Sequence, residues 1–407
     1  MLTLDKFDID YLRLVLEIHA HHIDGYVDSY YGPPELKTQI ESAPAKKPSE
    51  LLDAVRDLQE RIPATDESRQ RYLTAALRGI ECTIQMLNGV EFDYLDEVFR
   101  IYDIQPQLID ESRFVAAHAR LDRALPASTV GNSISARLQS WRQSFEVDTA
   151  GALPLLELAR IETRRRTASF VDLPDDELVE LSLVKDKPWN AYNWYLGNGR
   201  SLIEFNTDIP LQASMLLSTF AHEGYPGHHT EHLLKERMLY HEKGYAEQAA
   251  MLLHSPSAVI AEGIATTALE MIFPDGEHHQ WNADVLLPAA KIPTHPDMVE
   301  QMRIIAESSS DLRYVNSNAA IFYHTGKLNR SETIDYLQNY GLVNPQRAEK
   351  SFNFISHPLF RSYVFTYSVG QDLINKTTNP FETFRRLLVN QVLPSDLALT
   401  GNRNHHG

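Results

Sequence analysis

Apolar residues recur at the spacing of an α-helix along most of this chain. Between residues 11 and 18, tyrosine, leucine, valine and isoleucine form a broad apolar face with a period of 3.6 residues. The same periodicity and plausible capping residues predict further helices at a segment opened by Ser49 and at about 68–88, 154–169, 175–184 and 210–220. The chain is therefore expected to fold into a mainly α protein.

One segment departs from the helical period. Residues 201–206, Ser-Leu-Ile-Glu-Phe-Asn, nearly alternate polar and apolar side chains after the turn Gly197-Asn198-Gly199, which is typical of a short strand. This strand lies just ahead of the helix predicted at 210–220. We therefore expect a small β element that flanks this helix, where an extended peptide could add by backbone hydrogen bonds.

Length and charge limit the organisation and the partners. A chain of 407 residues exceeds the usual size of one domain. We expect one continuous two-lobed domain, with an N-terminal helical lobe at 1–175 and a second lobe at 176–407. The net charge of −17 repels phosphate backbones and anionic membrane surfaces. Neither nucleic acid nor a membrane is expected as a partner.

The single cysteine and the first residues of the chain indicate the cellular compartment of the protein. Cys82 lies in an apolar helical stretch and has no second cysteine with which to form an internal disulfide. The first residues show no basic region followed by an apolar run, and nowhere do about 18 apolar residues follow one another. These features predict a buried free thiol and a cytoplasmic location.

Two titratable side chains, His222 and Glu223, end the apolar helix predicted at 210–220. Buried polar groups need partners. In zinc peptidases the pattern His-Glu-x-x-His supplies them, because positions i and i+4 share one helix face and both imidazoles reach one metal. Here the next histidines are instead His228 and His229, at i+6 and i+7.

An unbroken helix would not bring these histidines to His222. At roughly 100° per residue, His228 would point about 120° away, and His229 would lie about 10 Å further along the axis. Pro226-Gly227 changes this geometry, because proline interrupts the hydrogen-bond ladder and glycine accepts unusual dihedral angles. We predict His222 and His228 as metal ligands, and His229 remains the alternative to His228.

A catalytic zinc needs a third protein ligand and an open position for water. Glu262 is the best candidate, because a lone carboxylate in an apolar helical run is costly unless it is paired or bound to a metal. His254 is an alternative ligand, although it precedes Pro256 in a predicted turn. Glu223 would then act as the general base that activates the zinc-bound water and later protonates the leaving group.

Three segments together resemble a known bacterial family. They are His-Glu-Gly-Tyr-Pro-Gly-His-His at 222–229, Glu262-Gly263, and Tyr-Val-Phe-Thr-Tyr-Ser-Val-Gly at 363–370. They are similar to the family catalogued as domain of unknown function 885, which is grouped with the gluzincin-type metallopeptidases. The resemblance covers most of the chain. It implies a mostly helical, zincin-like fold with a deep cleft, one zinc ion held by His222, His228 and Glu262, and Glu223 as the base.

The resemblance also points to residues that would contact the substrate. The segment around Tyr367 is similar to the Tyr-Ser-Leu-Gly segment of thermostable carboxypeptidases of the Taq type, which implies that Tyr367 donates to the oxyanion. Arg361 could pair with a substrate carboxylate, and Asn206, His229 and Tyr363 are further substrate-binding candidates. Plain structural roles remain open for these residues: core aromatics for the tyrosines, a surface ion pair for Arg361 and a turn for Asn206.

The sequence therefore predicts a zinc-dependent hydrolase, most simply a metallopeptidase that cleaves amide bonds in small peptides or amino-acid conjugates. Two other functions share part of the same pattern. One is a metal-dependent hydrolase of a non-peptide ester or amide, which would use the same ligands. The other is a non-catalytic metal-binding scaffold, in which Glu223 would have no chemical role.

Overall fold

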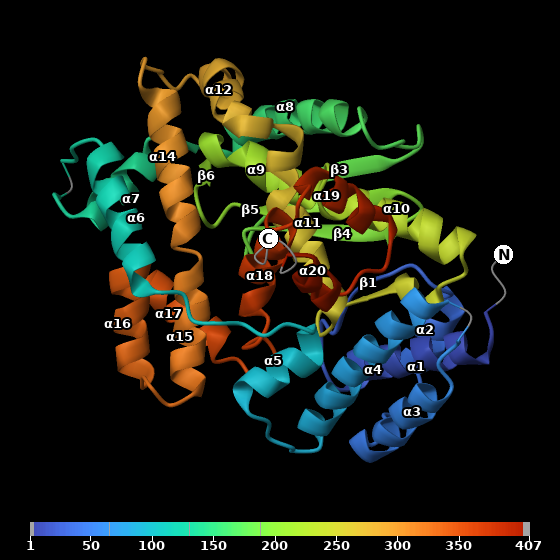
Figure 1. Cartoon of the computed structure of the whole chain (residues 1–407). Helices are drawn as coiled ribbons and strands as arrows, with labels where there is room; N and C mark the ends of the chain where they lie inside the picture. The colour runs from blue at the N-terminus through green and yellow to red at the C-terminus, as the bar shows by residue number, and fades with distance from the viewer. Residues whose placement is uncertain (1–3, 65, 130, 188, 402–407) are drawn as a thin grey trace.

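The computed structural model describes residues 4–64, 66–129, 131–187 and 189–401, with 63% of the residues in helices and 8% in strands (Figure 1). The mainly α fold with small β elements is thereby confirmed. The helices of the first half are α1 (Lys6–His21), α2 (Pro34–Glu41), α3 (Pro48–Glu60), α4 (Glu67–Leu87), α5 (Tyr94–Tyr102), α6 (Glu111–Ala124), α7 (Ile134–Gln143) and α8 (Thr149–Thr167).

The second half of the chain is also mainly helical. They are α9 (Ala213–Glu223), α10 (His228–Lys235), α11 (Pro256–Ile272), α12 (Glu277–Trp281), α13 (Leu287–Ala289), α14 (Met298–Asp311), α15 (Tyr314–His324), α16 (Arg330–Gly341), α17 (Pro345–Ile355), α18 (Val364–Asn375), α19 (Pro380–Val389) and α20 (Pro394–Gly401). Short 3₁₀ and π segments are η1 (Glu236–Glu242), η2 (Ala246–Ala249), η3 (Pro274–Gly276) and η4 (Asn282–Leu286).

Three small sheets accompany the helices in the part of the chain that the structure describes. Their strands are β1 (Val27–Tyr30), β2 (Glu146–Val147), β3 (Leu178–Val184), β4 (Ala191–Gly197), β5 (Arg200–Asn206), β6 (Leu211–Gln212) and β7 (Ala250–Leu252). The largest sheet has the order β3-β5-β4, with β5 parallel to β3 and antiparallel to β4. The other two sheets pair β1 with β7 and β2 with β6. Within the largest sheet β4 is an edge strand, and it contacts α9 and α10.

The strand predicted at 201–206 is confirmed as β5, but the helix predicted at 175–184 is wrong. Most of that segment is β3, which pairs in register with β5 from Leu178 opposite Arg200 to Val184 opposite Asn206. A short leucine- and valine-rich run fits either a buried helix or a strand, and the neighbouring strand decides the outcome.

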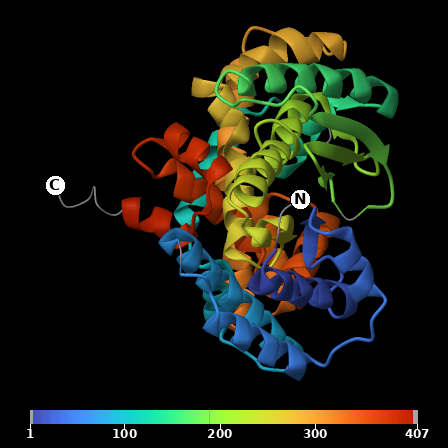
Figure 2. The same ribbon diagram turned by 90° about the vertical axis from the view of Figure 1, so that its right-hand side faces the viewer.

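Among the described residues, the two largest hydrophobic cores hold the fold together. The first unites α1, α3 and α4 with the segment around η2 and β7, and includes Leu12, Val55 and Leu252. The second joins α5–α8 to the central sheet and to helices as late as α18. Cys82 is a buried free cysteine of this second core, as predicted. In Figure 2 the blue N-terminal helices lie at one end and α8 with the sheet at the other. Among the described residues, the second core includes side chains from both sides of residue 175, from Cys82 to Phe365.

Helices α11 and α18 approach each other closely at two glycines. A Cβ atom at Gly263 would lie 2.8 Å from the carbonyl carbon of Gly370, and one at Gly370 would lie 2.3 Å from the carbonyl oxygen of Val259. Only glycine allows backbones to pack at this separation. The crossing brings Tyr363, the residue before α18, within hydrogen-bond distance of Glu262 on α11.

Helix α11 is buried in the interior because its residues are mostly apolar, and it packs there against α9, α18 and α19. Glu262 is its one carboxylate among the buried residues.

Within the described residues, no single helix is long and apolar enough to cross a bilayer. One bent pair of helices, Pro256–Ile272 with Pro274–Ala289, reaches the required length and hydropathy when the two are taken together.

Candidate metal centre

A sharp break separates α9 from α10. Helix α9 ends at Glu223, Gly224 caps it, and α10 begins at His228 directly after Gly227. The Tyr225–Pro226 peptide bond between them is cis. The backbone N–H of Gly227 donates to the carbonyl oxygen of Ala221 at 3.0 Å, so the chain folds back on the last turn of α9. The break lies at the Pro-Gly pair where the sequence predicts it.

Gly227 is required by this close return of the backbone. A Cβ atom there would lie 1.9 Å from the carbonyl oxygen of His222 and 2.5 Å from that of Ala221. Gly227→Ala is therefore expected to push α10 away from α9, to lower the free energy of unfolding by about 1–3 kcal/mol and to weaken metal binding. Denaturant unfolding and metal analysis measure both effects.

Gly341→Ala is the matched control for this variant, because its added Cβ would meet only ordinary contacts, the nearest at 3.8 Å. It is expected to retain metal. If Gly227→Ala had the same free energy of unfolding and the same metal content as the control, the close return of the chain at Gly227 would not be needed for stability or for metal binding.

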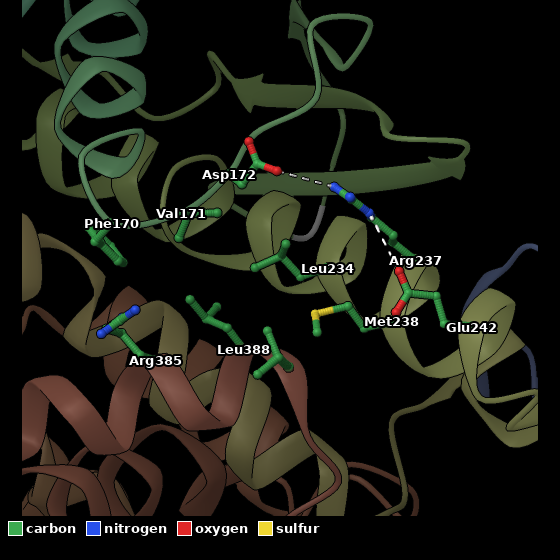
Figure 3. Close-up of a pocket in the computed structure, with 10 residues that line it drawn as sticks. Phe170, Val171, Asp172, Leu234, Arg237, Met238, Glu242, Arg385 and Leu388 are labelled. Carbon is green, nitrogen blue, oxygen red and sulfur yellow. Dashed lines mark ion pairs between the residues drawn. The ribbon is translucent and has the colours of Figure 1, made fainter.

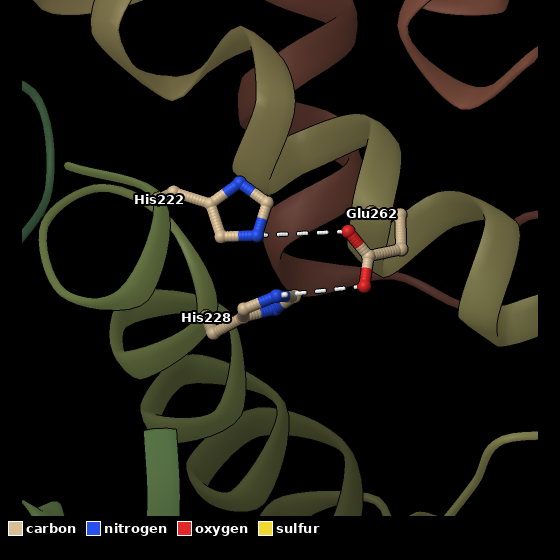
Figure 4. A group of neighbouring side chains, drawn as sticks. All are labelled: His222, His228 and Glu262. Carbon is tan, nitrogen blue, oxygen red and sulfur yellow. Dashed lines mark ion pairs between the residues drawn. The ribbon is translucent and has the colours of Figure 1, made fainter. Parts of the chain in front are cut away.

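The break brings His222, His228 and Glu262 together from three helices, and Figure 4 shows both imidazoles facing the carboxylate. Their ligand atoms all lie within 4.8 Å of one another. His222 Nε2 is 3.6 Å from Glu262 Oε2, and His228 Nε2 is 3.9 Å from Glu262 Oε1. Ligand atoms placed tetrahedrally at about 2.1 Å from zinc are roughly 3.4 Å apart. The cluster is thus close to the spacing that one zinc ion requires.

The chemistry of these side chains also fits a cation. Glu262 Oε1 accepts a hydrogen bond from the Tyr363 hydroxyl at 2.9 Å, whereas the buried Oε2 has no hydrogen-bond partner. Burial raises the pKa of Glu262 to about 8. It also lowers the pKa of His222 to about 4 and that of His228 well below the usual range, so both imidazoles are neutral and have a lone pair to offer. A bound cation would satisfy the unpartnered oxygen and both nitrogens.

His229 lies outside this cluster. It is fully buried, and its ring lies between the Ser201 hydroxyl, 2.8 Å from Nδ1, and Glu177 Oε2, 3.1 Å from Nε2. Burial acts to raise the pKa of Glu177, but hydrogen bonds from His229, Tyr225 and Arg164 lower it to about 2. Both nitrogens of His229 are thus engaged in fastening the start of α10 and the break before it to the sheet.

His254 is also engaged elsewhere. Its Nδ1 lies 3.3 Å from the Thr83 hydroxyl, and its Nε2 lies against the carbonyl oxygen of Leu359. The His254 ring is buried, and among the described residues His254 does not belong to the cluster of possible metal ligands.

Three of the predicted substrate-binding side chains have protein partners. Arg361 Nε donates to both oxygens of the buried Glu97 carboxylate at 3.1 Å. The Asn206 amide donates to the carbonyl oxygens of Lys187 and Trp189, and its Oδ1 accepts from the backbone N–H of Asp208, so it organises a turn. Tyr363 holds Glu262. The structure therefore gives each of them a partner within the fold.

A cavity of about 1290 Å³ opens onto the cluster and is lined by His222, Glu223 and Tyr367. Glu223 is 8% exposed, and its carbonyl oxygen accepts from the Asn193 amide of β4 at 2.5 Å. Burial raises the pKa of the Glu223 carboxyl, and the charges of Glu262 and Asp28 add to this effect. Tyr367 is 41% exposed, so its side chain is accessible to a molecule in the cavity.

Asp28 is a member of this environment that sequence reasoning missed. Its carboxylate accepts a hydrogen bond from the Tyr192 hydroxyl, and burial raises its pKa to about 6. Its charge also raises the pKa values of Glu262 and Tyr367. Asp28 lies on β1, which reaches the centre by pairing with the distant β7. No strong local signal marks Asp28, because two of the four residues of β1, Asp28 and Ser29, are polar.

A separate cavity of about 310 Å³ lies between η1 and α19 (Figure 3). Its Arg237 pairs with Asp172 and with Glu242, each at 3.8 Å. None of the three clustered ligands lines it. It is therefore distinct from the candidate metal centre.

Comparisons with known proteins support the fold. No family model and no curated protein matches the chain. A solved structure described as the putative lipoprotein from Colwellia psychrerythraea is similar to it with a TM-score of 0.50 and 13% identity, over 91% of this chain and 69% of its own. A putative lipoprotein of unknown function from Shewanella oneidensis gives a TM-score of 0.49 and 10% identity, over 97% and 88%.

The TM-score of the Colwellia structure, at 13% identity, shows a similarity of fold alone. The description of the Colwellia protein as a lipoprotein contradicts the cytoplasmic location predicted from the sequence. The prediction was weak on physical grounds, because one buried cysteine cannot form an internal disulfide in any compartment.

Proposed function

We propose that the protein is a zinc-dependent hydrolase, a gluzincin-like metallopeptidase of the type that includes the domain of unknown function 885 family. Its substrates would be small peptides or amino-acid conjugates. The observation that carries this proposal is the convergence of the ligand atoms of His222, His228 and Glu262 within 4.8 Å of one another. Glu223 lies beside His222 in the lining of the adjoining cavity. Two neutral imidazoles, one carboxylate and a nearby second carboxyl are the groups that metal-dependent hydrolysis requires.

Zinc, when bound, supplies a Lewis acid that polarises a carbonyl and makes water nucleophilic near neutral pH. The residues of the chain perform the remaining steps. Glu223 accepts the proton of the attacking water and passes it to the leaving amine, a role suited to a carboxyl whose pKa burial has raised. The Tyr367 hydroxyl donates to the oxyanion that forms on the carbonyl. Tyr363 orients Glu262 through its hydrogen bond.

Hydrolysis by the zinc-loaded protein tests this proposal. A panel of short peptides and N-acyl amino acids is expected to include hydrolysed compounds, with activity removed by a chelator and restored by zinc. Tyr367→Phe is expected to lower kcat by about 10²-fold at unchanged zinc content, because it removes one oxyanion donor. Tyr323→Phe, away from the cavity, is the control and should keep full activity.

Two results would contradict the proposal. One is a zinc-loaded protein that hydrolyses no member of the panel. The other is a protein that hydrolyses only non-peptide esters included beside the peptides, which would favour the ester hydrolase.

A further inference from the structure

The cavity at the metal centre continues into a second cavity of about 510 Å³. The two share lining residues, among them Ser218 and Thr219 of α9. Met215 of α9 lines the second cavity and His222 lines the first, seven residues further on. At 1.5 Å per residue this separation is about 10 Å, roughly the length of three extended peptide residues. A short substrate at the metal centre could therefore reach the second cavity.

Two arginines line the second cavity. Arg142, next to the end of α7, lines the second cavity, and Arg347 of α17 lines both. Within the described residues, neither guanidinium forms an ion pair or a side-chain hydrogen bond. Most other described arginines pair with aspartate or glutamate. In a chain of net charge −17, two such cations in the lining of one cavity are unusual.

The two charges oppose each other. Burial lowers the pKa of Arg142, and the positive charge of Arg347 lowers it further. Two like charges near a partly desolvated site are costly until an anion lies between them. His278 lines both cavities as well, and its buried Nδ1 has no hydrogen-bond partner. Arg142, Arg347 and the unpartnered Nδ1 of His278 therefore belong to the lining of the same second cavity.

Part of the wall of the second cavity is apolar. Trp141, Phe145, Met302 and Ile305 line the second cavity. A free inorganic anion would gain nothing from such walls, whereas an anion attached to an aromatic or aliphatic group would bury apolar surface against them. The lining therefore favours an organic carboxylate over free phosphate.

We propose that Arg142 and Arg347 bind a free carboxylate of the substrate, next to an apolar side chain held in the second cavity. This inference rests on the proposed function and names its substrate class, which is peptides or N-acyl amino acids with a free carboxyl end. A guanidinium recognises a carboxylate through two parallel hydrogen bonds. The sequence assigned this role to Arg361, but that residue is already paired with Glu97.

Binding of matched ligands tests the inference separately from catalysis. The probes are N-benzoyl-glycyl-phenylalanine and its C-terminal amide, titrated calorimetrically onto zinc-loaded Glu223→Gln protein, which cannot consume them. The free acid is expected to bind at least about tenfold more tightly than the amide, as a charge-assisted hydrogen bond implies. Adding Arg347→Gln should abolish this preference, and Arg347 is exposed, so its replacement leaves the core intact.

Arg386→Gln on α19 is the matched control, because Arg386 is exposed, makes no ion pair within the described chain and lies outside both cavities. It should keep the preference for the acid. Equal affinity for acid and amide, or a preference that survives Arg347→Gln, would overturn the inference. Inorganic phosphate that competes as strongly as the acid would also overturn it, because the site would then select charge alone.

Wild-type hydrolysis, measured in parallel, separates the two proposals. If the protein prefers the acid through Arg347 but the wild type hydrolyses neither probe, the result would support this subsite and contradict the peptidase function. Hydrolysis of acid and amide with the same kcat/KM would support the function and refute the subsite.

Discussion

Glu223→Gln is expected to lower kcat by about 10²–10⁴-fold while the protein keeps its zinc. Glutamine has nearly the same shape as glutamate but cannot accept a proton. Glu223 is also not one of the three clustered ligands, so its loss leaves the metal cluster intact. Steady-state kinetics with the most rapidly hydrolysed peptide, together with elemental analysis of the same preparation, measure both quantities.

Glu270→Gln is the matched control for this variant. Glu270 lines the same cavity, and burial raises its pKa, but its carboxylate accepts hydrogen bonds from Gln371 and Asn375. Its replacement should leave kcat within a few-fold of the wild type. Full turnover in Glu223→Gln, or an equal loss in Glu270→Gln, would refute the assignment of Glu223 as the base and favour a non-catalytic role for the metal.

His222→Ala is expected to reduce bound zinc from about one ion per chain to nearly none, and hydrolysis with it. A catalytic zinc has three protein ligands, and removing one leaves two groups that cannot hold the ion against a chelator. Elemental analysis after dialysis against a weak chelator gives the stoichiometry. Because the structure holds His222 as a neutral, partly exposed side chain, the substitution should not unfold the protein.

His295→Ala is the control for this experiment, because His295 is exposed and lies outside the ligand cluster. It should retain one zinc ion per chain. Stoichiometric zinc in both variants would mean that the ion binds elsewhere. Far-ultraviolet circular dichroism and the unfolding midpoint of each metal-free variant show whether a loss of zinc follows from ligand removal or from a change of fold.

Local signals were sufficient to predict much of the helical fold and the three clustered residues. Helical periodicity anticipated α9, and the Pro-Gly pair anticipated the break that returns His228 to His222. Glu262 was found because a carboxylate in an apolar helix needs a partner. In each case the physical cause lies within a few residues of the sequence position.

Features that depend on distant pairing were not predictable in this way. β3 is a strand because β5 lies beside it, although its apolar run also fits a helix. Arg361 pairs with Glu97, 264 positions away, so it is not free for a substrate. The neighbouring cationic charges of Arg142 and Arg347 come from α7 and α17. No local sequence pattern predicts such contacts, because they form only when distant segments come together in the tertiary fold.

Anomalous diffraction at the zinc absorption edge, from crystals of the zinc-loaded protein, is the most direct test of the central claim. One peak is predicted, about 2.0–2.2 Å from His222 Nε2, His228 Nε2 and a carboxylate oxygen of Glu262. The absence of a peak there, or a peak beside His229 or His254 instead, would contradict the account.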